Sequence, residues 1–259
     1  MSIPVIVMGA AGRMGQTLIR LIRQDADFTL TGIVEREEKK AAIASCGCRA
    51  ETDVNIFLQE DARALVIDFT APSASLSTAR AAARIGAALV VGTTGFSDAE
   101  KNELSEIAKT TPLLWSPNMS VGINALLKTL PELTRLLGGE YDLEVAEIHH
   151  GQKKDAPSGT ALRLAECLAA AKNWTLAESA CYHREGITGE RPVKEIGIQT
   201  LRGGDVAGVH TVYFLGHGER IEITHHAHSR ENFANGALRA ARWLYGRSPG
   251  RLYTMQDIL

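Results

Sequence analysis

The first 120 residues alternate short apolar runs with longer stretches whose apolar residues recur at helical spacing. Such alternation is typical of a parallel sheet wrapped by helices. Residues 3–8 form an apolar run that ends at Gly9, and residues 13–24 place apolar residues on one helical face. Ser97 and Glu100 form a capping-box pattern that predicts a helix running to about residue 109. The other predicted strands are 28–34, 64–69, 88–91 and 113–115, and the other predicted helix is 73–85.

The pattern changes after Pro117. Residues 121–137 read as a long apolar-periodic helix that Pro131 is expected to kink or split. Further strands are predicted at 144–148, 193–197, 208–215 and 220–224, and further helices at 160–171 and 231–245. We therefore predict an α/β protein with a Rossmann-like doubly wound parallel sheet in residues 1–120 and a second α+β domain in residues 121–230. The last helix, within 231–246, is expected to be able to pack back on the first domain.

Composition narrows the class of protein. The chain of 259 residues has a formal net charge of -2, so no basic surface is expected for nucleic acid. No run approaches the roughly 18 apolar residues of a membrane span, and no Lys or Arg precedes the apolar start, which favours a first strand over a signal peptide. The cysteines suit neither a zinc site nor a disulfide framework and indicate reduced thiols in a cytoplasmic protein. They are Cys46, Cys48, Cys167 and Cys181.

Three glycines follow the first strand, at positions 9, 12 and 15. Glycines at such a corner let the backbone approach a pyrophosphate, whose charge the next helix N-terminus favours. The spacing departs from the commoner G-x-G-x-x-G, and a purely structural turn is the alternative. Glu35 ends the second strand, twenty positions after Gly15, where a carboxylate can accept hydrogen bonds from ribose hydroxyls. The sequence therefore predicts a dinucleotide site.

The pair Glu35–Arg36 bears on the choice between NADH and NADPH. A carboxylate repels a 2′-phosphate and an adjacent guanidinium attracts it. Either interaction is worth roughly 4 kcal/mol at about 4 Å and an effective dielectric constant near 20. Because the two effects nearly cancel, we expect both cofactors to be used, with Arg13 a further candidate near the phosphate.

The densest polar cluster spans residues 147–160. His149, His150 and Lys153 suit proton transfer and anion binding, since imidazole titrates near neutrality and Lys is a compact cation. Ser158 is a candidate N-cap for the next helix, whose first backbone N–H groups, at Gly159 and beyond, would favour a carboxylate. An exposed polar loop that merely caps a helix is the alternative reading.

Residues 149–161 read His-His-x-x-Lys-x-Asp-Ala-Pro-Ser-Gly-Thr-Ala, and this segment resembles the signature of the 4-hydroxy-tetrahydrodipicolinate reductase (dihydrodipicolinate reductase) family. Every fixed position is matched, and the resemblance covers essentially the whole chain. Its other segments are the glycine-rich start through Met14, Gly-Thr-Thr-Gly-Phe at 92–96, Ser-Pro-Asn-Met-Ser-Val-Gly at 116–122, Glu-Ile-Thr-His at 222–225, Ser229-Arg230 and Phe-Ala-Asn-Gly at 233–236.

The resemblance implies roles for individual residues. His149 would be a proton donor or acceptor and Lys153 a proton donor, while His150, Gly159 and Thr160 would bind the substrate, a cyclic dicarboxylate. The cofactor, NADH or NADPH, would be bound by Gly9, Ala10, Ala11, Gly12, Arg13, Met14, Glu35, Arg36, Gly92, Thr93, Thr94, Ser116, Pro117, Asn118 and Met119. No metal is implied.

The implied activity is the reduction of 4-hydroxy-tetrahydrodipicolinate to tetrahydrodipicolinate on the route to diaminopimelate and lysine. The chemistry agrees, because a ring carbon that receives a hydride leaves electron density that an acid such as Lys153 must protonate. The resemblance also implies a cytoplasmic homotetramer assembled through the second domain, without nucleic-acid or membrane partners. Two domains that carry separate halves of the site suggest domain closure as a hypothesis.

Other residues carry weaker signals. His225, His226 and His228 invite a metal interpretation, but neighbours on a strand face opposite sides and no carboxylate or cysteine lies at regular ligand spacing. Asp68, at the end of a buried strand, either touches cofactor or terminates the strand. The three tryptophans are expected to be packing residues. They are Trp115, Trp174 and Trp243.

Two other functions compete with this assignment. A dehydrogenase acting on another amino-acid precursor, such as an aspartate-semialdehyde or homoserine enzyme, is the first. An aspartate-semialdehyde enzyme would need a cysteine nucleophile, and all four cysteines lie outside the glycine and histidine motifs. A non-catalytic dinucleotide sensor is the second, and the retention of both His149 and Lys153 argues against it.

Overall fold

The computed structural model describes residues 2–259, which separate into two compact units. The first unit contains the chain up to Val121 together with Arg230–Leu259, and the second contains Gly122–Ser229. Helix α8 (Glu231–Leu244) therefore belongs to the first unit although it follows the second in sequence.

The first unit is built on a parallel sheet in the order β12-β6-β5-β4-β1-β2-β3. Its strands are β1 (Ile3–Met8), β2 (Phe28–Val34), β3 (Ala50–Glu51), β4 (Leu65–Asp68), β5 (Leu89–Val91), β6 (Leu113–Trp115) and β12 (Leu252–Tyr253). From β1 the chain runs outward through β2 and β3, then crosses to β4 on the other side of β1. The order thus reverses between β1 and β4, the switch point at whose carboxyl edge ligands bind in open α/β sheets.

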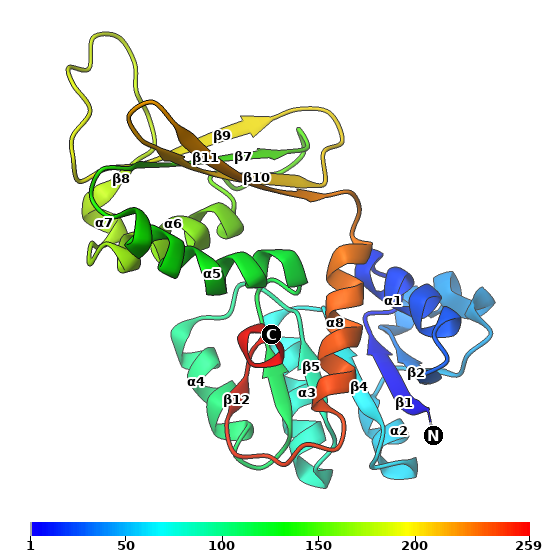
Figure 1. The fold of residues 1–259 in the computed structure, drawn as a ribbon. Helices are drawn as coiled ribbons and strands as arrows, with labels where there is room; N and C mark the ends of the chain where they lie inside the picture. Colours follow the sequence, from blue (N-terminus) through cyan, green and yellow to red (C-terminus); the bar gives the residue numbers. More distant parts are fainter. Residues whose placement is uncertain (1) are drawn as a thin grey trace. The chain divides into compact units, whose positions relative to one another are not determined.

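Helices cover both faces of this sheet (Figure 1). They are α1 (Arg13–Gln24), α2 (Val54–Glu60), α3 (Pro72–Ile85), α4 (Asp98–Ile107) and α8, with 3₁₀ segments at Glu37–Cys46 and Met255–Ile258. Val5 and Val7 of β1 pack with α1 and α8, whereas Ile6 points into the core beneath α2, α3 and α4. A strand buried on both faces is apolar throughout, which is why residues 3–8 show no polar alternation.

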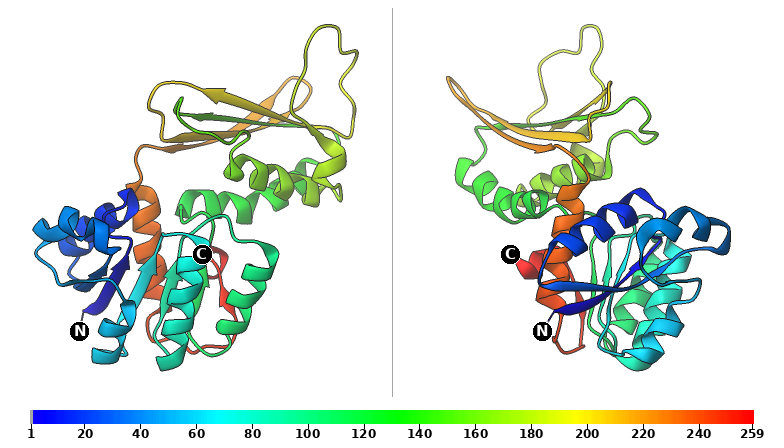
Figure 2. Two further views of the ribbon diagram at one scale, coloured as in Figure 1. Left: turned by 180° about the vertical axis from the view of Figure 1, so that it is seen from behind. Right: turned by 90° about the vertical axis from the view of Figure 1, so that its right-hand side faces the viewer.

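The second unit is a mixed sheet in the order β11-β10-β7-β9-β8. Its elements are α5 (Val121–Leu137), β7 (Asp142–His149), α6 (Gly159–Ala171), α7 (Leu176–Ser179), β8 (Ala180–Cys181), β9 (Ile196–Arg202), β10 (Gly208–Leu215) and β11 (Arg220–Ala227). Strand β7 is parallel to β9 and antiparallel to β10. Helices α5 and α6 lie along one face of the sheet and bury a single apolar core (Figure 2).

The predicted elements recur with end shifts of a few residues, apart from one strand. The strand expected at 193–197 was placed too early, because β9 begins only at Ile196 and continues to Arg202. Pro192 lacks an N–H for a sheet ladder, and Val193 is 83% exposed, so this stretch is a loop. Helix α5 runs through Pro131 as one element rather than splitting. Within residues 2–259, none of the helices is both long and apolar enough to cross a membrane.

Candidate active site

The glycine turn after β1 is shaped by close backbone packing. Gly9 has a φ of +66°, a conformation that favours glycine, and its carbonyl accepts a hydrogen bond from the Gly12 N–H at 2.9 Å. A Cβ on Gly15 would lie 2.3 Å from the Gly9 carbonyl oxygen and 2.8 Å from the Ala10 Cα. The first turn of α1 therefore lies directly on the loop. Gly12 caps α1 without a side-chain hydrogen bond, so the turn presents backbone N–H groups, as an anion site requires.

Glu35 lies next to this turn, directly after the carboxyl end of β2. Its buried carboxylate accepts hydrogen bonds from the Ala11 N–H at 2.8 Å and from the Arg36 N–H at 2.9 Å. The carboxylate thus braces the glycine loop itself, in addition to any contact with a ribose. The Arg36 guanidinium is exposed and lies 3.2 Å from Glu38, where it can still turn toward a ligand phosphate.

Arg230 lies near the N-terminus of α1, a position that its sequence motif did not reveal. It is the N-cap residue of α8, which packs beside α1 (Figure 1). Partial burial lowers the pKa of Arg230, and the positive charge of Arg13 at the start of α1 lowers it further. The two guanidinium groups therefore repel each other close to the glycine turn, which favours an anion there.

Asp68 organises the loops that follow β4 and β5. It is fully buried, and its Oδ1 accepts hydrogen bonds from Thr70 and from the Ser75 hydroxyl at 3.0 Å. The Ser75 hydroxyl is in turn 2.7 Å from that of Thr93. A Cβ on Gly92 would lie 2.1 Å from the Phe69 ring. The expected cofactor segment 92–94 is thus held against the end of β4, and Asp68 acts as its brace.

The segment after β6 completes this edge of the sheet. The Ser116 hydroxyl donates to the Asn118 carbonyl at 2.8 Å, which closes a tight turn. A Cβ on Gly236 of α8 would lie 1.8 Å from the Met119 carbonyl oxygen, so α8 packs directly on this turn. The Trp115 indole donates to the Thr93 carbonyl at 3.0 Å. All predicted cofactor segments of the first unit therefore follow the carboxyl ends of β1, β2, β5 and β6.

In the second unit, the helix-covered face of the sheet changes from apolar to polar side chains along its strands. On β7, Leu143 and Val145 point into the apolar core beneath α5 and α6, and the same alternation brings Glu147 and His149 to that face. Thr200 and Arg202 of β9 and His210 of β10 stand beside them in register. The helix-covered face thus ends in a buried polar cluster, which consists of Glu147, His149, Ser158, Thr200, Arg202 and His210.

Glu147 is the centre of this cluster and is 0% exposed. Its two oxygens accept from the Arg202 guanidinium at 2.7 and 2.8 Å, and from the Ser158 N–H at 3.0 Å. His149 Nδ1 lies 2.5 Å from Oε2. Burial alone would raise the pKa of Glu147, but the hydrogen bonds from Arg202, His149 and Ser158 outweigh it and lower the pKa to about 2. Glu147 is therefore a carboxylate, able only to accept hydrogen bonds.

His149 is held between Glu147 and His210. Burial lowers the pKa of His149, and the neighbouring charges of Lys153 and Arg202 add to this, while Glu147 opposes it. The His149 and His210 rings meet edge to face with centroids 5.1 Å apart. Burial also lowers the pKa of His210, to about 4, and its Nε2 lies 2.9 Å from the Ser158 hydroxyl. Both rings are thus neutral near pH 7.

The loop from His150 to Ser158 joins this cluster to α6. Lys153 is half-buried, and its ammonium lies 2.9 Å from the Asp155 carboxylate. The Ser158 hydroxyl accepts from the Ala161 N–H at 3.1 Å and so caps α6, as predicted. Gly159 and Thr160 form the first turn of that helix. Proton-bearing side chains and a helix N-terminus thus lie within one short segment.

The remaining histidines do not form a metal site in the described residues. His225 is paired in register with His210, and His226 stacks with His228 at a centroid separation of 6.4 Å. Across residues 2–259, no group of three or more His, Cys, Asp or Glu side chains is arranged to hold a metal ion.

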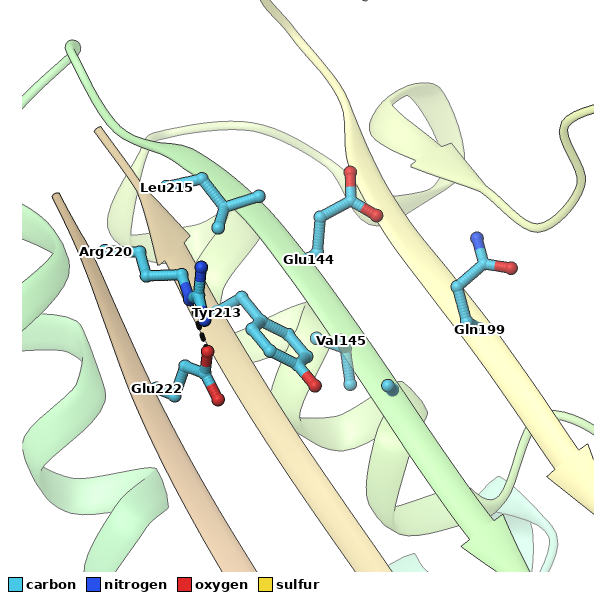
Figure 3. Close-up of a pocket in the computed structure, with 8 residues that line it drawn as sticks. Glu144, Val145, Gln199, Tyr213, Leu215, Arg220 and Glu222 are labelled. Carbon is cyan, nitrogen blue, oxygen red and sulfur yellow. Dashed lines mark hydrogen bonds and ion pairs between the residues drawn. The ribbon is translucent and has the colours of Figure 1, made fainter. Parts of the chain in front are cut away.

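A shallow pocket lies on the face of this sheet opposite α5 and α6 (Figure 3). Its walls alternate with the core residues along the same strands, as the outward positions of a sheet must. They include Glu144, Gln199, Tyr213, Leu215, Arg220 and Glu222. This pocket holds no histidine and lies apart from the polar cluster.

Reasoning from sequence placed Glu147 in the polar segment without giving it a role, and did not single out Thr200, Arg202 or His210. Glu147 carries a readable signal, since it lies two residues before His149 on a strand and so shares its face. Arg202 and His210 carry none, because their approach depends on the register of β9 and β10 against β7.

Comparison with known proteins identifies the family. The family described as dihydrodipicolinate reductase, N-terminus, matches residues 3–119, and that described as dihydrodipicolinate reductase, C-terminus, matches residues 122–259. Proteins named 4-hydroxy-tetrahydrodipicolinate reductase are 61% identical in Nitratidesulfovibrio vulgaris and 60% identical in Oleidesulfovibrio alaskensis, each over 100% of both chains. A dipicolinate-bound dihydrodipicolinate reductase from Paenisporosarcina sp. TG-14 has the same fold, with a TM-score of 0.79 over 100% of both chains at 22% identity. With both halves of the chain matched and relatives this similar along its whole length, the protein belongs to the dihydrodipicolinate reductase family of oxidoreductases.

Proposed function

We propose that this protein reduces 4-hydroxy-tetrahydrodipicolinate to tetrahydrodipicolinate with NADH or NADPH, in the diaminopimelate route of lysine biosynthesis. Beyond family membership, the observation that carries the proposal is the juxtaposition of His149, Lys153 and the N-terminus of α6 in the second unit. Proton transfer and carboxylate binding are the two tasks that this substrate demands beyond the hydride.

The first unit supplies the cofactor site in this proposal. The lack of a side chain at Gly15 lets the first turn of α1 pack on the Gly9 and Ala10 backbone, which brings the helix N-terminus to the glycine turn, as a pyrophosphate site requires. Backbone N–H groups of the turn would bind the phosphates, Glu35 the adenosine ribose, and segments 92–94 and 116–119 the nicotinamide side. When bound, the nicotinamide supplies a hydride.

The second unit supplies the acid and the anion site. Loss of water from the substrate leaves an unsaturated ring, and after hydride arrives at one carbon the neighbouring position takes a proton. Lys153, an ammonium held beside Asp155, is the proposed donor, with His149 as the second proton-transfer group. His150 and the backbone of Gly159 and Thr160 would bind the carboxylates. The dipicolinate bound to the Paenisporosarcina enzyme, itself a cyclic dicarboxylate, supports this substrate class.

Both nicotinamide cofactors are proposed to serve. The Glu35 carboxylate already accepts hydrogen bonds from the Ala11 and Arg36 N–H groups, so backbone dipoles oppose its negative charge before a cofactor arrives. Arg36 is exposed beside it, and its surface ion pair with Glu38 at 3.2 Å can be exchanged for a contact with a 2′-phosphate. Neither cofactor is therefore excluded by charge.

We further propose a cytoplasmic homotetramer assembled through the second unit. The sheet face opposite α5 and α6 has no covering helix within the described unit and carries Tyr213 and Leu215 (Figure 3). The loop between β8 and β9 holds the exposed side chains of Ile187 and Val193 and is tied to the sheet by the Arg184–Glu144 ion pair at 2.7 Å. Apolar exposure on an anchored loop suits a subunit interface. Light scattering after size exclusion tests this, and a monomeric mass would contradict it.

A coupled assay tests the activity. The enzyme that condenses pyruvate with aspartate semialdehyde would generate the substrate, and the loss of absorbance of NADH or NADPH would report turnover. We expect turnover with both cofactors, dependent on both precursors. A protein that binds cofactor without turnover would be a sensor, and one that turns over aspartate semialdehyde or homoserine alone would be a different dehydrogenase.

A further inference from the structure

We infer that the buried carboxylate of Glu147 positions both the proton-transfer ring of His149 and the N-terminal end of α6, so that one side chain aligns the two parts of the substrate site. The catalytic consequence rests on the proposed function. The geometry rests only on contacts within the second unit.

Oxygen Oε2 of Glu147 decides which nitrogen of His149 is reactive. Because the carboxylate only accepts hydrogen bonds, the proton of a neutral His149 must lie on Nδ1, 2.5 Å away. Nε2 is then the nitrogen that gains and loses a proton. A Cβ at position 208 would lie 3.0 Å from this atom, so Gly208 keeps the space beside Nε2 clear.

Oxygen Oε1 holds the other part of the site. It accepts from the Ser158 N–H at 3.0 Å, one residue before α6 begins, and from Arg202 at 2.8 Å. The same guanidinium nitrogen of Arg202 donates to the Asp155 carbonyl at 2.7 Å. Glu147 and Arg202 together therefore fix the loop from Asp155 to Ser158, and with it the first turn of α6.

The charges around His149 come from several elements. Glu147 lies on its own strand, Arg202 on β9, His210 on β10, and Lys153 on the loop after β7. Glu147 is the only negative group among these four. Its removal leaves His149 facing cations and a buried ring, which lowers the pKa of His149 further.

Substitution of Glu147 by Gln and by Ala separates the two tasks. In Glu147→Gln, the amide oxygen still accepts from Ser158 and Arg202, while the amide N–H faces Nδ1 and forces the proton onto Nε2. We expect kcat to fall about 10²- to 10⁴-fold with KM roughly unchanged. Glu147→Ala loses both anchors, so KM rises as well. Glu166→Gln, on the exposed side of α6 beside Arg163, makes the same charge change and is the matched control.

Two readouts distinguish positioning from mere support of the fold. In the pH profile of kcat/KM, the limb that belongs to His149 should move down by about 1–3 units in Glu147→Gln. The second readout is ¹⁵N-histidine NMR, in which the His149 signal is identified as the one that is absent from His149→Gln. The His149 ring should carry its proton on Nδ1 in the native protein and on Nε2 in Glu147→Gln.

The outcomes are separable from those of the proposed function. A native His149 with its neutral-state proton on Nε2 would overturn the inference, and this measurement requires neither a Glu147 variant nor substrate. An unchanged ring proton or a native kcat in Glu147→Gln would overturn it too. If the native protein does not reduce the proposed substrate, the proposed function fails while the NMR result still decides the positioning role.

Discussion

Substitution of Gly15 by Ala tests whether the close packing of α1 on the glycine turn creates the cofactor site. The new methyl group would lie 2.3 Å from the Gly9 carbonyl oxygen, and both other near atoms, in Ala10, are also backbone. No side chain can move aside, so α1 must shift by about 1 Å to restore normal contact, and overpacking of this kind costs about 1–3 kcal/mol. The higher helix propensity of Ala offsets about 1 kcal/mol of this.

The net loss of stability is therefore about 0–2 kcal/mol, or a fall of at most about 8 °C in Tm for a protein of this size. The effect on the cofactor should be larger, because the N–H groups of the turn are displaced from the pyrophosphate. We expect Kd for NADH and NADPH to rise at least about tenfold, equivalent to 1.4 kcal/mol.

Thermal unfolding followed by circular dichroism and titration of cofactor fluorescence would measure the two effects. Gly139→Ala is the matched control, since a Cβ there meets nothing within 4 Å. It should leave cofactor affinity unchanged. Native cofactor affinity in Gly15→Ala would refute the reasoning, whatever the change in Tm.

Three further predictions follow from the site. Lys153→Ala and His149→Ala should each lower turnover at least about a hundredfold while cofactor binding is retained, and stopped-flow turnover near the native rate in both would remove the assignment. The pKa of Glu147 is lowered to about 2 from an ordinary 4.5, so the contacts of its ionised carboxylate should stabilise the fold fully above about pH 5. That stabilisation, on the order of 3 kcal/mol, is lost as pH falls from about 4.5 toward 2. Urea unfolding across this range should therefore be less pH-dependent in Glu147→Gln, and equal pH dependence would contradict the ion-pair geometry. Arg36→Ala should weaken the binding of NADPH more than the binding of NADH. A ratio of the native specificity constants for the two cofactors above about a thousandfold would contradict the balance between the charges of Glu35 and Arg36.

Much of the first unit could be predicted from local pattern. The continuous apolar run of β1 and the capping box at Ser97 depend only on neighbouring residues, and both are found as expected. In the second unit, the N-cap of α6 by Ser158 could likewise be predicted from neighbouring residues alone. Helix α2 was missed, because it is a short segment whose start is marked by the Asp53 side chain alone.

The polar cluster shows where local reasoning stops. Strand β9 was placed too early because Val193 resembles a strand residue, yet the chain there is an exposed loop. With β9 misplaced, Arg202 could not be seen to pair with Glu147, which is 55 residues away. The residue types of the 149–160 motif pointed to proton transfer, and Glu147 shares the face of His149 by simple alternation along β7. The Arg202 guanidinium that holds this carboxylate becomes visible only through the register of β9 against β7.

The return of α8 to the first unit has a consequence for the order in which the chain acquires its structure during synthesis. One face of the parallel sheet is completed by α8 and by Met255 and Ile258, which leave the ribosome after the whole second unit. The second unit, Gly122–Ser229, is continuous and has all its strands before then. The inserted unit can therefore fold first, while the sheet beneath the glycine turn stays uncovered on one face until α8 has been synthesised.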